Sequence, residues 1–390
     1  MNHARTIATV GLICGMALAT HAVAQDATVI RGASILAPDG TITSGHGIVI
    51  RGEKIVAVAT ADSLTADAVH AYPGAVVCPG LIDAYSRIGT RFGRDERFRP
   101  IDPGLSIVDG LDSLDPTFAR ALAAGITTVV AVPAENLIVG GAAAVVRTWA
   151  DGPGLDVLRA DGPIAMSLGE SVFDLQLEPT SRAGAVAMLR HAMAESAAGR
   201  GHPRLTGVMA GELPTLIRCE RSVDVGAAMM VFRGPPRPLS LVHSADLLDL
   251  AEDLEGSDVS IIVGPFSFGT SSDVLAGPGA VAARGLPIAF ATAAGEPDSL
   301  RTTAALAVRY GLDPAVARRG LTSTAAKTSG IDSRVGSLAT GLDADIVVFS
   351  ADPLRLDARV LAIYVRGRKV YADVPPIEET IERSWEGAGS

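Results

Sequence analysis

The sequence has few of the side chains that most often carry metal and thiol chemistry. It contains 3 cysteines and 7 histidines among 390 residues, and its only lysines are Lys54, Lys327 and Lys369. Cys78 and Cys219 lie beyond the N-terminal segment, and two cysteines do not make a disulfide framework. We therefore expect both to be buried thiols, and a small domain stapled by disulfides is excluded.

Positive charge is also scarce. The chain has 43 acidic and 33 basic residues, which gives a formal net charge of −10 at pH 7. So acidic a chain is a poor candidate for binding nucleic acid or an anionic membrane surface. After the N-terminal segment, no apolar run approaches the roughly 18 residues that a membrane-spanning helix needs. We expect neither a nucleic-acid partner nor a membrane span.

The N-terminal segment itself has the pattern of an export signal. An apolar run from Ile7 to Ala19 follows a short segment with one arginine, and the small-residue pattern Ala22-Val23-Ala24 precedes Gln25. These features are typical of a cleaved secretory signal peptide, residues 1–24, cut after Ala24. We therefore expect a periplasmic or secreted protein.

The pattern along the rest of the chain predicts an α/β fold of two parts. Short β-type runs broken by turn residues occupy both ends, and each end is too small to fold alone. We expect one β-sandwich composed of residues 25–78 plus 336–372. Residues 79–335 alternate strand-like runs with helical patterns, which favours a TIM-type (β/α)₈ barrel, with a doubly wound open sheet as the alternative. Residues 373–390 read as an acidic C-terminal tail. The expected barrel strands are the opening strand after Gly80 and the runs 127–132, 143–146, 163–167, 215–218, 240–243, 260–263 and 286–290.

Two motifs carry a family resemblance. Pro79-Gly80-Leu81-Ile82-Asp83 opens the predicted barrel, and Gly341-Leu342-Asp343-Ala344-Asp345-Ile346-Val347-Val348 closes it. Their order and spacing resemble the amidohydrolase superfamily, closest to its imidazolonepropionase and Xaa-Pro dipeptidase-like branch. The resemblance implies a barrel with a small β-sandwich. It also implies a hydrolase whose metal is held at the carboxyl ends of the barrel strands.

The same resemblance points to the residues that should hold the metal, and several are replaced. Tyr85 and Arg87 stand at the positions of the two histidines of the first strand. A phenol and a guanidinium do not replace neutral imidazoles as ligands of a zinc-class ion. Strand four should carry a lysine near Ala165, and none of the three lysines is there.

The later strands show a similar pattern. Arg218 occupies the histidine position of strand five, His243 keeps that of strand six, and an alanine such as Ala293 stands where strand eight should bear the general base. Arg218 and Glu220, two residues apart, form either a ligand-binding pair or an ion pair that fills the vacated site. A Cys219 nucleophile aided by His243 is the third alternative, although Cys219 should face away from the barrel axis if Arg218 faces it.

These observations lead to two hypotheses. The first is an exported amidohydrolase-fold protein with a dismantled metal site and no cofactor, which acts as a non-catalytic partner or a binder of small ligands. Its partner would be a second copy or an intact amidohydrolase relative. The second is an active hydrolase of C–N bonds with an atypical zinc site. The binding candidates are Tyr85, Arg218, Glu220 and His243, and His243 is the candidate catalytic residue.

Overall fold

The computed structural model describes residues 27–64, 66–90, 96, 98–174 and 176–373. The predicted signal peptide and the acidic tail from residue 374 onward lie outside this part of the chain. Within the described part, no helix is both long enough and apolar enough to cross a membrane.

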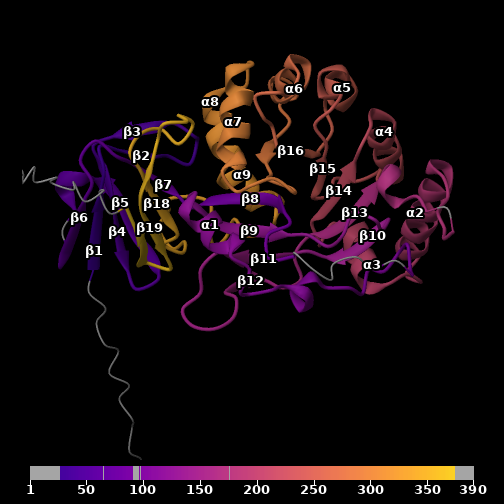
Figure 1. The fold of residues 1–390 in the computed structure, drawn as a ribbon, viewed down its shortest axis with the longest axis horizontal. Coiled ribbons are helices and arrows are strands. Elements are labelled where there is room, and N and C mark those ends of the chain that lie inside the picture. The colour runs from indigo at the N-terminus through magenta and orange to yellow at the C-terminus, as the bar shows by residue number, and fades with distance from the viewer. Residues whose placement is uncertain (1–26, 65, 91–95, 97, 175, 374–390) are drawn as a thin grey trace, which may run out of the picture.

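Strands from the two ends of the chain lie together on one side of the molecule (Figure 1). A four-stranded sheet has the order β5-β4-β1-β6, and a six-stranded sheet has the order β20-β19-β18-β7-β2-β3. β18 pairs antiparallel with β7, so that Val347 lies opposite Cys78. Buried Ile30, Ile48 and Val348 belong to one apolar cluster shared by both sheets. The strands are β1 (Ala27–Arg31), β2 (Ser34–Leu36), β3 (Ile42–Ser44), β4 (His46–Arg51), β5 (Lys54–Thr60), β6 (Ala68–Ala71), β7 (Val76–Pro79), β18 (Ile346–Phe349), β19 (Val360–Val365) and β20 (Arg368–Ala372).

The larger part of the molecule contains two further sheets, of order β12-β11-β9-β8 and β10-β13-β14-β15-β16-β17. Neighbours from β13 to β17 run parallel, and β8 runs parallel to β9. The strands are β8 (Leu81–Ser86), β9 (Ile126–Ala131), β10 (Val139–Ala142), β11 (Ala144–Arg147), β12 (Val157–Arg159), β13 (Ile164–Leu168), β14 (Thr215–Cys219), β15 (Leu239–Val242), β16 (Ser260–Val263) and β17 (Ile288–Phe290).

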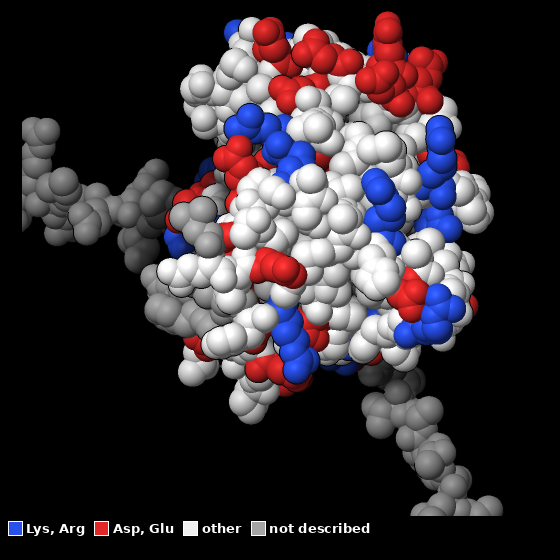
Figure 2. All heavy atoms as spheres, turned by 90° about the vertical axis from the view of Figure 1, so that its right-hand side faces the viewer, with Lys and Arg blue, Asp and Glu red and all other residues white. Residues whose placement is uncertain are grey.

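Helices cover the outside of these strands (Figure 1). They are α1 (Thr117–Ala123), α2 (Arg182–Ala197), α3 (Pro203–Ala210), α4 (Ser222–Val231), α5 (Leu247–Leu254), α6 (Ser272–Ala282), α7 (Ser299–Arg309), α8 (Pro314–Gly320) and α9 (Ser323–Thr328). Figure 2 shows acidic side chains gathered along the upper edge of the molecule, the edge on which α5 and α6 lie in Figure 1. Helix α5 contributes the exposed Asp249, Glu252 and Asp253.

The prediction of eight parallel strands in one closed barrel is right only in part. All eight expected strands are present, but β11 runs antiparallel to β9, and β10 runs antiparallel to β13. Every residue from 132 to 163 is described, and none is helical. Without a helical crossover, the chain that leaves β9 returns beside it in the opposite direction. The arrangement is therefore TIM-barrel-like, with two sheets in place of one closed ring.

Two connections bring the sheets together. β10 and β11 are separated by Ala143 alone. On the other side, Ser86 at the end of β8 forms an isolated parallel bridge with Ala293, just beyond β17. Ile82, Leu216 and Ile262, from strands of both sheets, share one buried apolar cluster. The carboxyl ends of β8 and β13–β17 consequently open on a common mouth, where TIM-type folds carry their functional groups.

Candidate functional site

Glu135 is the centre of the charged groups at this mouth. The side chain is 8% exposed, and its carboxylate accepts a hydrogen bond from the Tyr85 hydroxyl at 3.1 Å. Arg87 donates to the same carboxylate at 2.5 Å. The Nε of Arg218 lies 3.3 Å from Oε2 of Glu135. Three donors from two separate strand ends thus converge on one nearly buried carboxylate.

The alternation of side chains along each strand determines which residues point toward the mouth. Tyr85 belongs to β8 and lies in the apolar cluster inside the barrel-like body, while Arg87 follows the last residue of that strand. Arg218 is the fourth residue of β14, next to Cys219, which packs in the outer apolar cluster. Adjacent residues of a strand face opposite sides. Cys219 therefore faces the outer helices, and Arg218 faces the mouth.

Arg218 and Glu220 form an ion pair at the mouth. Nη1 of Arg218 lies 2.8 Å from Oε1 of Glu220. Glu220 also accepts hydrogen bonds from the backbone N–H groups of Glu170, at 2.8 Å, and Ser171, at 3.2 Å. Gly169 has φ +135°, and a Cβ there would meet the Glu220 side chain at 2.7 Å. The loop after β13 therefore needs glycine to fit around this carboxylate.

Burial and neighbouring charges shift the pKa values of Glu220, Arg218 and Tyr85. Burial alone would raise the pKa of Glu220, but the hydrogen bonds from Ser171, Glu170 and Arg218 lower it on balance. Burial opposes the charge of Arg218, yet the carboxylate of Glu135 leaves its pKa raised. Burial, followed by the Glu135 charge, raises the pKa of Tyr85 well above its ordinary value. Tyr85 accordingly remains a neutral donor between charged neighbours.

His243 lies apart from this network. It is 3% exposed, and its Nδ1 lies 2.8 Å from the backbone oxygen of Cys219. Its Nε2 accepts from the backbone N–H of Asp246 at 3.3 Å. A carbonyl oxygen only accepts, so Nδ1 carries the proton and the lone pair of Nε2 faces a backbone donor. Both ring nitrogens are thus used to hold the loop after β15.

The same contact bears on the Cys219 alternative. His243 meets the carbonyl of Cys219 and not its thiol, and burial raises the pKa of that thiol far above its ordinary value. A reactive cysteine needs the opposite shift. Cys78 and Cys219 are both free and buried, as predicted.

A second buried carboxylate joins the first and last strands of the barrel-like body. Asp83 is fully buried and accepts from the backbone N–H of Thr292 at 2.9 Å and from the Thr292 hydroxyl. Burial raises its pKa to about 6 against the effect of these hydrogen bonds. The next residue, Ala293, has φ +48° and donates its N–H to the Tyr85 carbonyl at 2.9 Å. Ala293 is the residue at the position where the resemblance implies a general base. It lies at the mouth and carries no acidic group.

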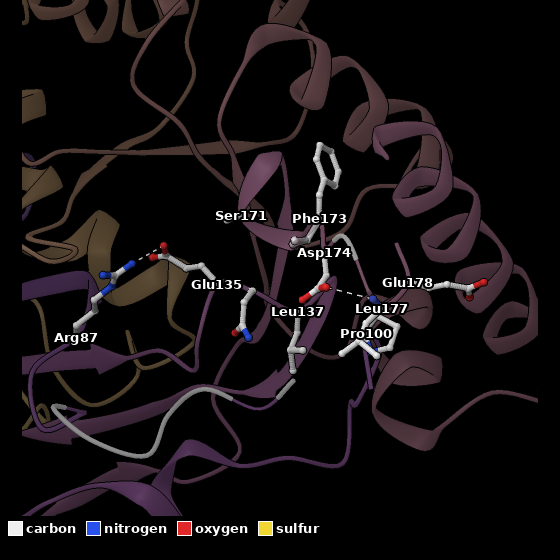
Figure 3. A pocket seen from close by; sticks show the side chains of 11 residues that line it. Arg87, Pro100, Glu135, Leu137, Ser171, Phe173, Asp174, Leu177 and Glu178 are labelled. Atoms are coloured by element: carbon white, nitrogen blue, oxygen red, sulfur yellow. Dashed lines mark hydrogen bonds and ion pairs between the residues drawn. The ribbon is translucent and has the colours of Figure 1, made fainter. Parts of the chain in front are cut away.

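A pocket of about 350 Å³ opens beside Glu135. In Figure 3, Arg87 and Glu135 lie at one end of it and Glu178 at the other, with Leu137 between them. Sequence reasoning missed Glu135. The available signal was an acidic residue three positions after the predicted strand run 127–132. The pocket is lined by Arg87, Pro100, Glu135, Asn136, Leu137, Ser171, Val172, Phe173, Asp174, Leu177 and Glu178.

The donor chemistry at the mouth does not fit a zinc-class ion. A guanidinium has no lone pair to give, and it repels a divalent cation. Arg87 and Arg218 lie within 3.3 Å of the Glu135 carboxylate, and His243 has both nitrogens on backbone groups. Within the described part of the chain, no three His, Cys, Asp or Glu side chains are grouped so that they would hold a metal ion.

The comparisons with known proteins agree with the fold. The amidohydrolase family model matches residues 225–374. An amidohydrolase from Thermotoga maritima MSB8 is similar at a TM-score of 0.78 and 22% identity, over 89% of this chain and 100% of that one. A putative prolidase from Bifidobacterium longum gives 0.59 and 16%, over 89% and 95% of the two chains. A prolidase solved with N-methylphosphonate-L-proline gives 0.58 and 18%, over 89% and 100%. No curated protein matches the chain.

These matches confirm the predicted resemblance to amidohydrolases, with prolidase-like proteins among the structural neighbours. At identities of 22% and below, the structural likeness establishes the fold alone. Activity has to be argued from the side chains at the mouth.

Proposed function

We propose that this chain, which matches the amidohydrolase family over residues 225–374, has a dismantled metal site and binds a small ligand without hydrolysing it. The observation that carries the proposal is the Glu135 carboxylate with Arg87 and Arg218 beside it. Two permanent positive charges occupy the place where the resemblance implies a divalent ion. A guanidinium does not coordinate water, so such a pair cannot generate the water of low pKa that a metal ion supplies.

The ligand we propose is small and carries a carboxylate. Arg87 lines the pocket of about 350 Å³, a volume at the lower end of those that hold small molecules. Its Nε is buried without a hydrogen-bond partner. A guanidinium pairs readily with a carboxylate through two parallel hydrogen bonds. The neighbour solved with a proline derivative makes N-acetyl-L-proline a reasonable first probe.

The proposal extends to location and assembly. It places the mature chain outside the cytoplasm after cleavage behind Ala24, as a homo-oligomer or with an intact amidohydrolase relative. It divides the chain into a composite β-sandwich, residues 25–78 plus 336–372, and a barrel, residues 79–335. Tyr85, Arg218 and Glu220 belong to the proposed binding mouth, and His243 holds the loop after β15.

Metal analysis tests the proposal. The purified chain is incubated with zinc, dialysed against metal-free buffer and analysed by mass spectrometry, and dipeptides and N-acyl amino acids are assayed for hydrolysis. We expect far less than one zinc per chain and no hydrolysis above the buffer rate. N-acetyl-L-proline should bind in calorimetry, and Arg87→Gln should weaken that binding by about tenfold or more.

A different result of the metal analysis would overturn the proposal. One zinc per chain that is lost in His243→Ala but kept in His46→Ala would establish the alternative, a C–N hydrolase with an atypical zinc site. His46 is the matched control because it lies on β4, in the sheet at the far end of the molecule.

A further inference from the structure

A second pocket lies at the opposite end of the barrel-like body from the mouth. It has a volume of about 600 Å³ and includes Leu239, Ser260 and Ile288, which are the first residues of β15, β16 and β17. Helices α8 and α9 contribute Arg319 and Lys327. We propose that this pocket binds a small organic phosphate, a ligand class that the site at the mouth does not imply.

The positive charges of the pocket are the first reason. Lys327 is exposed, and its side chain makes no hydrogen bond or ion pair with any described residue. Arg319 donates Nη1 to the backbone oxygen of Asp39, which leaves its Nε and Nη2 without a hydrogen bond in the described part of the chain. Asp258 also lines the pocket, yet it pairs with neither cation within the described residues. In a chain of net charge −10, two such cations at one pocket form a local site for an anion.

The contrast with the other two lysines sharpens this point. Lys54 lies 2.6 Å from Asp343, and Lys369 lies 5.5 Å from the centre of the Tyr72 ring. Both have an internal partner for their charge. Lys327 faces a pocket instead.

Hydroxyl groups provide the second, independent reason. Ser240 is 3% exposed and lines the pocket, and its hydroxyl has no hydrogen-bond partner among the described residues. Because the rest of the residue is buried, this hydroxyl is reached from the pocket and can donate to a ligand there. Ser260 and Thr324 add two further hydroxyls to the lining. A buried serine, a lysine and an arginine fork are donors that phosphate oxygens accept.

The apolar part of the pocket lining favours a phosphate ester over free phosphate as the ligand. Leu239, Leu286 and Pro287 line the pocket beside the polar groups. A pocket of about 600 Å³ also has room for more than one phosphate group. A phosphate monoester with a compact apolar body therefore fits better than inorganic phosphate.

Calorimetry on the full chain at low ionic strength tests this proposal. The probes are phenyl phosphate, inorganic phosphate and benzyl alcohol, which has an apolar ring but no charge. We expect phenyl phosphate to bind more tightly than inorganic phosphate, and benzyl alcohol to show no measurable binding. Lys327→Met should weaken phenyl phosphate by about tenfold or more, because it removes a charge-assisted contact. Lys369→Met, which removes the same charge elsewhere, should leave the affinity unchanged.

Two further variants keep the outcome unambiguous. Ser240→Ala should also weaken phenyl phosphate binding, and Arg87→Gln should not, because Arg87 lies at the mouth. Urea unfolding of Lys327→Met should match the wild type, since the side chain is exposed. No binding of phenyl phosphate to the wild type, or equal binding to Lys327→Met, would overturn the proposal. Neither result bears on the proposed function, which metal analysis tests separately.

Discussion

At the scale of single residues, the Glu135 carboxylate has to balance two guanidinium groups that are themselves two-thirds buried. Arg87 and Arg218 are 32% and 31% exposed, and Glu135 is 8% exposed. Pairs in such a setting are screened less than pairs on the surface, and removal of one partner leaves the other charges poorly solvated. The network therefore stabilises the mouth as a unit.

Glu135→Gln tests this argument. The substitution keeps the shape of the side chain but removes the charge, so Arg87 loses its carboxylate partner and Arg218 keeps only Glu220. We expect a loss of about 1–3 kcal/mol in the free energy of unfolding, measured with urea at pH 7.5. Glu296→Gln is the matched control, because its pair with Arg120 is exposed on both sides and should be worth less than about 1 kcal/mol. Equal losses in the two variants would contradict a special role for Glu135.

The residues of the mouth were predicted unevenly for a physical reason. The positions of Tyr85 and Arg218 at strand ends could be predicted because each lies at the end of a β-type run, and parallel strands bring such ends to one edge. Glu135 was missed because the chain after β9 turns back as a strand. The sequence pattern instead predicted 127–132 and 143–146 as successive strands of one barrel, with no functional role for the residues between them. The backbone partners of His243 depend on the loop after β15, which periodicity does not describe.

At the scale of elements, Asp83 joins β8 to the end of β17. Their backbone pairing is limited to the isolated bridge between Ser86 and Ala293, and the hydrogen bonds from Thr292 to Asp83 add side-chain contacts beside it. The retained motif Pro79-Gly80-Leu81-Ile82-Asp83 thereby has a structural role at its last residue. Ala293, strained at φ +48°, is the residue that this closure holds in place.

The burial of Asp83 predicts a pH dependence. Its pKa is raised from 3.8 to about 6. Between these values the folded chain holds a proton that the unfolded chain has lost, so the free energy of unfolding falls as pH rises from about 4 to about 6. The fall is at most about 3 kcal/mol. Asp83→Asn, which keeps an acceptor for Thr292, should remove this fall in urea unfolding between pH 4 and pH 7.5.

An exposed acid provides the control. Asp62 is exposed and lies just after β5, and Asp62→Asn should leave the pH profile as in the wild type. Parallel profiles for the wild type and Asp83→Asn would show that Asp83 does not titrate in this range.

At the scale of the whole molecule, one arginine connects segments from distant parts of the chain. The side chain of Arg147, on β11, is fully buried and lies 2.6 Å from Asp343 and 2.8 Å from Asp345. Asp156 lies 3.2 Å away on its other side. Burial opposes the charge of Arg147, yet Asp345 and the other carboxylates leave its pKa raised. The two aspartates of the closing sequence motif thus hold the barrel-like body against the strands that follow them.

Arg147→Met should therefore destabilise the whole chain. Methionine fills much of the space but leaves Asp343 and Asp345, which are 3% and 4% exposed, without their central cation. Lys54 and Arg334 still reach Asp343, at 2.6 and 2.7 Å, whereas Asp345 loses its one paired cation among the described residues. We expect a loss of about 3–5 kcal/mol in the free energy of unfolding.

Trp149, two residues from Arg147, reports the transition by fluorescence, and circular dichroism follows the whole fold. Arg368→Met, which breaks only the exposed pair with Asp151, should cost less than about 1 kcal/mol. A loss in Arg147→Met no larger than in this control would mean that the buried cluster does not hold the two parts together.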